Sequence, residues 1–575
     1  MRKIVRIPLL LVDPQYLREQ LKTGPSELLL ATPIESSQFP HDEEFLDGPA
    51  TSRVAVYDFE ADSEVLRPGV KFLPQGVGKT ISRYDVTLPD IDDTEALIKT
   101  VESDSFIQLN TFAIVMKTIF FFESPDSLGR EVTWAFESRQ LQVRPRAGLW
   151  ENALYERDSG SLQFFYFPSK AGYNVYTALS QDIVAHETAH AILDGVAPDL
   201  YKATRTESLA LHEAIADLTA IMLTLLNEMI IFSVYAISSS QLDIASALSK
   251  IGKELGTEMG RKMRRDLGID CLRVLNNKRK LDPASVDLTD PYHVSEVLSG
   301  AMFQVFLKCA GGLTEEEEKW VPEKAIDMLE DFEKRVLGAA REVSRLVFRA
   351  LDYLPPGEVS LADFGRAMIA AHRAVNGERR EQLWLMQELA MRGVVKDEGD
   401  LEVDTEIVGR KLKDVSCREL LESEAAAKRF AENHRDLLRI PSSSDFEVQP
   451  RLVRDRVDNR GKKRQKRDLV FRVTWKKEEE HDLGPRFASH WGYKVGTTLV
   501  LDWNTSTILS VLTTEQGGSQ YSDRDRTLKK WMEQGRLQTL KESKKLHDQA
   551  LKDKIIARKT GRTMWVTNSA RVLCS

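Results

Sequence analysis

The chain has 575 residues, of which 42% are hydrophobic and 29% charged, and its formal net charge is -8, which is the composition of an ordinary soluble globular protein. This length exceeds the size at which one hydrophobic core stops growing, so we expect two or three domains. The four cysteines are far apart and form no CxxC pair, which argues against a disulfide framework or a structural zinc ribbon and favours a reducing, cytoplasmic compartment.

Short apolar runs separated by Pro, Gly and Asp characterise residues 1–180, and we expect this N-terminal region to be rich in strands. The runs that we interpret as strands include Ile7–Val12, Phe106–Phe122 and Leu162–Phe167. No membrane anchor is expected. The longest apolar candidate, around Ala220 to Ile237, contains Asn227 and Glu228 and falls short of the roughly 20 apolar residues that a membrane span needs.

Residues 181–395 have a different pattern, which predicts a mostly helical lobe. Apolar residues now recur at helical spacing. The helical segments are Ile183–Leu193, Leu209–Ile231, Val297–Leu307, Ala325–Leu351 and Leu361–Ala374.

The remaining chain divides into two parts. Residues 396–467 are predicted to hold a charged helix near Leu420–Leu438 and a basic linker, Pro450–Arg467. Residues 468–575 are predicted to form a small α+β domain. Its expected elements are strands at Leu469–Trp475 and Leu499–Thr514 and a basic helix at Arg526–Ile556.

An HExxH segment starts the helical lobe, with His186, Glu187 and His190. Positions four apart on a helix differ by about 40° around the axis, so both imidazoles point to one side and can hold a single ion. Zinc accepts imidazole nitrogen and carboxylate oxygen in a tetrahedron, and a catalytic zinc site leaves its fourth position to water. The alternative is a surface helix with two unrelated histidines.

A second segment, His212–Asp217, favours the metal site. It places Glu213 inside an otherwise apolar helix, where an unpaired carboxylate costs several kcal/mol unless it binds a cation. We therefore expect Glu213 to be the third zinc ligand, after His186 and His190. Asp217, one turn on, can accept the free N–H of a ligating histidine and fix its tautomer.

In these segments the sequence resembles the thermolysin-like gluzincins, whose zinc ligands are two His and one Glu. The segment HEAIAD at His212–Asp217 is similar to the family's NEAISD, with His in place of Asn. The resemblance implies an α+β fold of the two-lobed zincin type. It has a strand-rich N-terminal lobe and a helical C-terminal lobe with Zn²⁺ between them, followed here by a smaller α+β domain.

The resemblance also implies further site residues. Asn152 and Ala153 match the family's edge strand, which binds the substrate backbone, and Arg273 is placed where the family has an arginine that holds a substrate carbonyl. Tyr201 and His293 match the family's two oxyanion stabilisers. The alternatives are an ordinary turn at Asn152, a buried Tyr, a helix-capping His and a solvated Arg.

The function predicted from these residues is hydrolysis of peptide bonds in a peptide or protein substrate, with Glu187 as the general base. Two other interpretations stay open. The chain could be a catalytically silent zinc scaffold, although a scaffold has no need of Glu187. It could also bind nucleic acid or an acidic partner through the cations of the basic segment, which are Arg451, Arg454, Arg456, Arg460, Lys462, Lys463, Arg464, Lys466 and Arg467. The part after residue 396 could also cover the cleft or recruit a regulatory partner.

Overall fold

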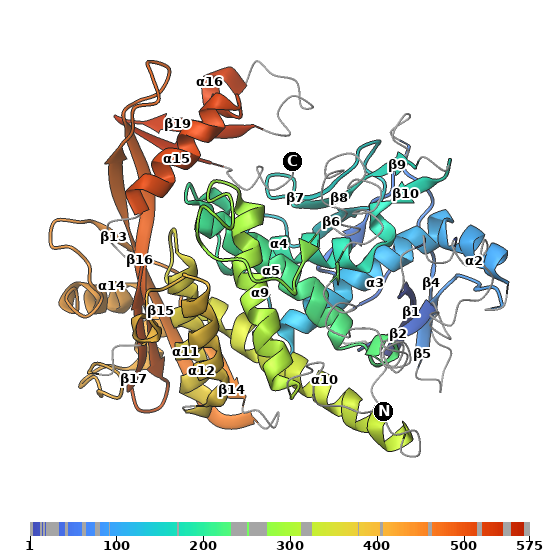
Figure 1. Ribbon diagram of the computed structural model, residues 1–575, viewed down its shortest axis with the longest axis horizontal. Helices are drawn as coiled ribbons and strands as arrows, with labels where there is room; N and C mark the ends of the chain where they lie inside the picture. Colours follow the sequence, from blue (N-terminus) through green and yellow to red (C-terminus); the bar gives the residue numbers. More distant parts are fainter. Residues whose placement is uncertain are drawn as a thin grey trace.

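A computed structural model describes most of the chain and gives an α+β fold. Figure 1 shows helices α4 and α5 crossing the middle of the molecule, with the N-terminal sheets on one side and a large C-terminal sheet on the other. The described residues are 4–11, 14, 18, 34–40, 44–59, 65–74, 81–90, 93–169, 172–231, 250–251, 273–311, 325–377, 379–402, 406–457, 463–514, 520–543 and 554–567.

Two four-stranded sheets form in the N-terminal region, which confirms that it is rich in strands. The first has the order β2-β1-β5-β4 and the second the order β3-β6-β8-β7. Strand β7 therefore lies at the edge of its sheet. The strand bounds are β1 Ile4–Leu10, β2 Ile34–Pro40, β3 Val54–Val56, β4 Phe72–Leu73, β5 Ile81–Tyr84, β6 Leu141–Arg144, β7 Ala153–Glu156 and β8 Ser161–Phe164, and the small β9–β10 pair is Tyr166–Pro168 and Asn174–Tyr176.

The strand prediction for Phe106–Phe122 is wrong, because these residues belong to helix α3, Asp104–Glu123. The Ser103 side chain caps the helix by accepting a hydrogen bond from the Phe106 amide. Helix α3 is buried on nearly every side, so its sequence lacks the one-sided apolar pattern of a surface helix. The shorter helix α2, Thr94–Val101, precedes it.

Helices α3 and α5 have the length and apolar composition that a membrane span requires. Their most apolar windows are 83% and 94% buried inside the protein. Core helices of soluble proteins pass the same test, so the two helices are weak evidence for a membrane span.

The five helices predicted for the second region are confirmed. They are α4 Gln181–Val196, α5 Thr206–Leu225, α9 Pro291–Cys309, α10 Ala325–Phe348 and α11 Leu361–Asn376, and α12 Arg380–Met391 follows them. Helix α5 packs against α4, α9, α10 and α11, so it is the central helix of this lobe. Its side chains are almost all buried, which gives any polar residue on it a desolvated environment.

The predicted basic linker at Pro450–Arg467 is wrong. Strand β14, Leu452–Val457, pairs antiparallel with the long strand β15, Lys463–Glu480, so these residues belong to a sheet. That sheet has the order β13-β15-β16-β20-β19-β18, with β14 beside β15 and β17 beside β16. The other strand bounds are β13 Phe446–Val448, β16 His490–Asp502, β17 Ile508–Thr513, β18 Leu537–Thr539, β19 Ile555–Thr560 and β20 Thr563–Val566.

The two faces of this sheet enter different cores. Val470 and Val500 join the large core that also contains the helical lobe. Phe471 and Leu499 join a second core together with residues of helices α13, Cys417–Glu422, and α14, Glu424–Asn433. Figure 1 shows α14 on the side of the sheet that faces away from the helical lobe. Because alternate residues of a strand point to opposite faces, the sheet is covered on both sides and is fused to the helical lobe.

The predicted basic helix at Arg526–Ile556 is too long. Helix α15 spans Gln520–Glu533, and Gly535, with φ 65°, follows it. The chain leaves the helix at Gly535 in the left-handed conformation, which glycine adopts without strain. The Gly535 amide donates to the carbonyl of Met532 at this helix end. Strand β18 and the short helix α16, Leu540–Ser543, come next.

A buried carboxylate joins the C-terminal sheet to the helical lobe. Asp352, in the short helix η4 (Arg349–Asp352), is fully buried, and its Oδ1 lies 2.6 Å from a guanidinium nitrogen of Arg130. Arg454 of β14 and Arg472 of β15 reach the same carboxylate at 3.7 and 3.9 Å. Burial alone raises the pKa of Asp352. The charges of the arginines, above all Arg130, lower this pKa by a larger amount, so the carboxylate is charged.

Candidate active site

Helix α4 presents His186, Glu187 and His190 together. The two histidines are four residues apart, and one ligand atom from each of the three side chains lies within 4.8 Å of the others. Glu187 is 9% exposed and His190 6%, so the cluster is largely shielded from water. The small residues Ala185 and Ala189 are fully buried, so they face the core and allow close packing of this helix.

Helix α5 contributes Glu213, which is completely buried. Its Oε1 lies 3.3 Å from His190 Nε2 and its Oε2 lies 3.4 Å from His186 Nε2. In a tetrahedral zinc site with bonds of about 2.0–2.1 Å, neighbouring donor atoms lie about 3.3–3.4 Å apart. Two imidazole nitrogens and one carboxylate are also the donors of a catalytic zinc site, so the residues fit this metal in chemistry, and the distance from each histidine to its nearer carboxylate oxygen is close to the donor spacing.

Asp217, one turn after Glu213, contacts the opposite side of the His186 ring. Its Oδ1 lies 3.1 Å from His186 Nδ1, which leaves Nε2 directed at Glu213. Burial lowers the pKa of His186, but the hydrogen bonds with Asp217 and Glu213 outweigh it and raise the pKa to about 10. Asp217 is thus placed to orient His186.

His212 is a site residue to which the sequence analysis gave no role. Its Nδ1 lies 2.6 Å from Nδ1 of His190, and the His212 side chain is 1% exposed. Burial, followed by the nearby His190, lowers the pKa of His212, so its ring is neutral. Its position directly before Glu213 in the sequence could have indicated this role, because the two residues share one buried turn of α5.

The residues expected to bind the substrate backbone lie at the edge strand. Ala153 is the first residue of β7, which pairs antiparallel with β8 and packs against α4. Asn152 precedes the strand, and its Oδ1 accepts a hydrogen bond of 2.8 Å from the Ala153 amide.

The expected oxyanion stabilisers contact residues outside the His186–Glu213 cluster. Tyr201 lies in the short helix η2, Leu200–Lys202, where its ring packs edge-on against Tyr155 and its hydroxyl accepts a 3.4 Å hydrogen bond from the Arg157 amide. His293 lies in the first turn of α9, with Nδ1 3.9 Å from Asp290, and its side chain is 37% exposed. Their oxyanion roles remain predictions.

Arg273, the third residue expected to contact substrate, begins the short strand β12, Arg273–Val274, which pairs with β11, Lys250–Ile251. Its side chain lies outside the described part of the structure, so its role stays a prediction.

The basic segment is partly used for structure. Arg451 donates to the carbonyls of Leu420 and Leu421, and the buried Arg454 donates to the carbonyl of Arg349. The side chains at 456 and from 460 to 466 lie outside the described part of the structure. At least two of the nine cations counted as a phosphate-binding run therefore hold the fold together.

A second group of possible metal ligands consists of Glu342, His372 and Glu381. The Gln382 amide nitrogen lies 2.8 Å from both the Gly377 carbonyl and His372 Nδ1, so it donates to both. The proton of neutral His372 is therefore on Nε2, where it is donated to Glu342 over 2.8 Å. An Nε2 that carries a proton has no lone pair for a metal, so this group is a hydrogen-bond network.

Comparison of the sequence with models of known protein families gives no match, and no curated protein is significantly similar to it.

Proposed function

We propose that this protein is a zinc-dependent peptidase of the thermolysin-like gluzincin type, with His186, His190 and Glu213 as the metal ligands. The observation that carries the proposal is the pair of distances, 3.3 and 3.4 Å, from the Glu213 carboxylate to the two histidine Nε2 atoms. Each distance, one to each carboxylate oxygen, is close to the spacing of neighbouring donor atoms in a tetrahedral site, and the HExxH segment supplies a general base beside the cluster.

Each residue of the cluster has a task in this proposal. Bound zinc supplies a Lewis acid that polarises the scissile carbonyl and favours ionisation of water. Glu187 takes the proton from the attacking water and passes it to the leaving amine. Asp217 and His212 hold the rings of His186 and His190 so that both Nε2 atoms point at one position.

An intact general base separates this proposal from a silent zinc scaffold. A scaffold requires the three ligands but has no use for a carboxylate that lies beside them. Glu187 is buried and belongs to the same group of ligand atoms as the two histidines. Its position in the cluster therefore favours catalysis over a purely structural zinc site.

The substrate class is a peptide or protein bound in extended form. Strand β7 is an edge strand that packs next to the helix carrying His186 and Glu187. An extended peptide can add to such an edge through main-chain hydrogen bonds. In the proposed two-lobed zincin, this edge and helix α4 form the two sides of the substrate cleft, with Asn152 and Ala153 nearest the scissile bond.

The test is digestion of a mixed peptide library by the purified full-length chain. The expected result is cleavage that stops when a chelator removes the metal and returns when zinc is added. A Glu187→Gln protein prepared in parallel shows whether the cleavage belongs to this site. Cleavage by the zinc-loaded Glu187→Gln protein at the wild-type rate would contradict the proposal.

A further inference from the structure

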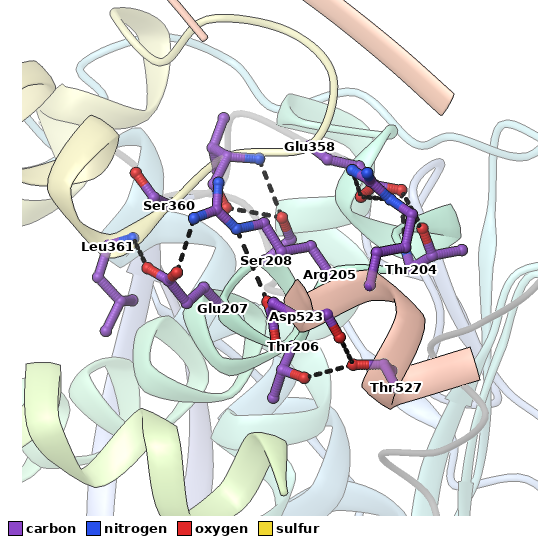
Figure 2. Close-up of polar contacts among 12 residues, drawn as sticks. Thr204, Arg205, Thr206, Glu207, Ser208, Glu358, Ser360, Leu361, Asp523 and Thr527 are labelled. Atoms are coloured by element: carbon purple, nitrogen blue, oxygen red, sulfur yellow. Dashed lines mark hydrogen bonds and ion pairs between the residues drawn. The ribbon is translucent and has the colours of Figure 1, made fainter. Parts of the chain in front are cut away.

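The helix that carries Glu213 begins without a cap of its own. Arg205 occupies the N-cap position of α5, and its side chain makes no capping hydrogen bond. Figure 2 shows that residues from two distant parts of the chain gather at this end of α5.

One of these parts is the segment before α11. The Glu358 carboxylate accepts hydrogen bonds of 2.8 Å from both the amide and the hydroxyl of Thr204, two residues before α5. In the same region the Glu207 carboxylate accepts a 2.9 Å hydrogen bond from the amide of Leu361 (Figure 2). These contacts hold the start of α5 against the start of α11.

The other part is helix α15 of the C-terminal region. The Arg524 guanidinium donates to Thr204 Oγ1 and to Glu358 at 2.9 Å, and to Glu479 at the end of β15 at 2.5 Å. The Arg524 side chain is 3% exposed, so these ion pairs are desolvated. Arg524 therefore connects the large C-terminal sheet to the start of α5.

A second contact from α15 lies at the first residue of α5. The hydroxyl oxygens of Thr527 and Thr206 are 2.8 Å apart, and both side chains are buried (Figure 2). The Thr527 hydroxyl also donates to the carbonyl of Asp523 in its own helix, so it accepts from Thr206. Thr206 is seven residues, about two helical turns, before Glu213.

From these contacts we infer that α15 positions the metal helix α5, with Arg524 and Thr527 as positioning residues of the zinc site. This inference rests on the proposed function and extends it. A helix is stiff along its axis, so a displacement at Thr206 is transmitted to Glu213, whose carboxylate must stay within a few tenths of an ångström of its place. The C-terminal region is then an integral part of the peptidase and not a removable cover.

The test compares zinc affinities of full-length variants by competition with a chromogenic chelator, well below each variant's Tm. Thr527→Val removes the hydroxyl at constant volume, Thr527→Ser keeps it, and Arg524→Gln removes the charge. Lys529→Gln is the control on the outer side of the same helix, where Lys529 pairs only with Asp525 of its own helix in the described structure.

The expected Kd for zinc rises about tenfold in Arg524→Gln, which loses several buried hydrogen bonds, and about threefold in Thr527→Val, which loses one. Thr527→Ser and Lys529→Gln keep the wild-type Kd. For a peptide that the wild type cleaves, kcat falls in Arg524→Gln and Thr527→Val while KM stays constant. A variant that is less stable but still folded does not show this change.

Wild-type zinc affinity in folded Arg524→Gln and Thr527→Val would overturn the inference and leave the proposed function standing. If Arg524→Gln does not fold, the difference between Thr527→Val and Thr527→Ser decides, and equal Kd values for these two overturn it. A wild-type chain that binds no zinc overturns the proposed function and this inference together.

Discussion

The Nδ1 atoms of His190 and His212 lie 2.6 Å apart, and both rings are buried. Burial lowers the pKa of His212, so its neutral ring can accept a hydrogen bond at Nδ1. In the proposed zinc site Nε2 of His190 is a ligand, so the His190 proton is on Nδ1 and is donated to His212. In this proposal the second histidine sets the tautomer of the metal ligand.

Replacement of His212 separates this role from simple packing. His212→Leu removes the acceptor, so we expect the Kd for zinc to rise about 10- to 100-fold, as when other outer-shell partners are lost. His212→Asn keeps a carbonyl acceptor at the same position and is expected to bind zinc nearly as tightly as the wild type. Competition with a chelator measures both, and equal affinities for the Leu and Asn variants would argue against the role.

Substitution of Glu187 tests the general base. Glu187→Gln keeps the size of the side chain but cannot take a proton, so kcat/KM should fall by about 10²–10⁴-fold or more. Zinc content should be unchanged, because Glu187 is not a ligand in the proposal. Peptide hydrolysis and elemental analysis on the same preparation provide the measurement. Loss of zinc together with activity would instead make Glu187 a ligand.

The contribution of the buried Asp352 carboxylate to the free energy of unfolding can be tested by substitution. Asp352→Asn leaves Arg130, Arg454 and Arg472 buried around a neutral side chain, so we expect a loss of about 3–5 kcal/mol in the free energy of unfolding. Urea denaturation measures the loss. Asp331→Asn, which breaks an exposed i,i+4 pair with Arg335, is the matched control and should change stability by less than about 0.5 kcal/mol.

The carboxyl group of Asp523 predicts a pH dependence. Burial and then the charge of Glu207 raise its pKa from 3.8 to about 6, although Arg205 and Arg526 act in the opposite direction. A carboxyl whose pKa is higher in the folded state binds more protons there, so its stabilising effect is full below about pH 4 and is lost as the pH rises through 6.

Asp523→Asn should therefore raise the stability at pH 7.5 by roughly 1–3 kcal/mol relative to the wild type and raise it by only about a third as much at pH 4.5, where the folded carboxyl is protonated but the unfolded one is mostly ionised. Thermal unfolding of both proteins at the two pH values measures the difference. A Tm gain that is equal at both pH values would mean that the Asp523 charge is not disfavoured in the folded protein.

Much of the helical lobe could be predicted from the sequence because its helices are amphipathic or carry a recognisable motif. The five expected helices are present, and the His186–His190 spacing already implies one shared face of α4. The same reasoning failed for Phe106–Phe122, because a helix buried on all sides has no polar face to set a period. Local pattern alone could not distinguish it from a strand.

The C-terminal errors have a different cause. The Arg and Lys residues of 450–467 have the composition of a solvated linker, yet Arg454 is buried by pairing with Asp352, about a hundred positions earlier in the chain. The contact of His212 with His190 and that of Arg524 with Thr204 are likewise set by packing between distant segments. Spacing in the sequence cannot reveal such partners.

Zinc stoichiometry tests the central claim most directly. Elemental analysis of the full-length chain, after metal removal, reloading and dialysis, should give about one zinc ion per chain for the wild type and for Glu187→Gln. Glu213→Gln, which is nearly isosteric but lacks the ligating charge, should retain almost none. A wild-type chain without zinc, or equal zinc in the wild type and Glu213→Gln, would contradict the account.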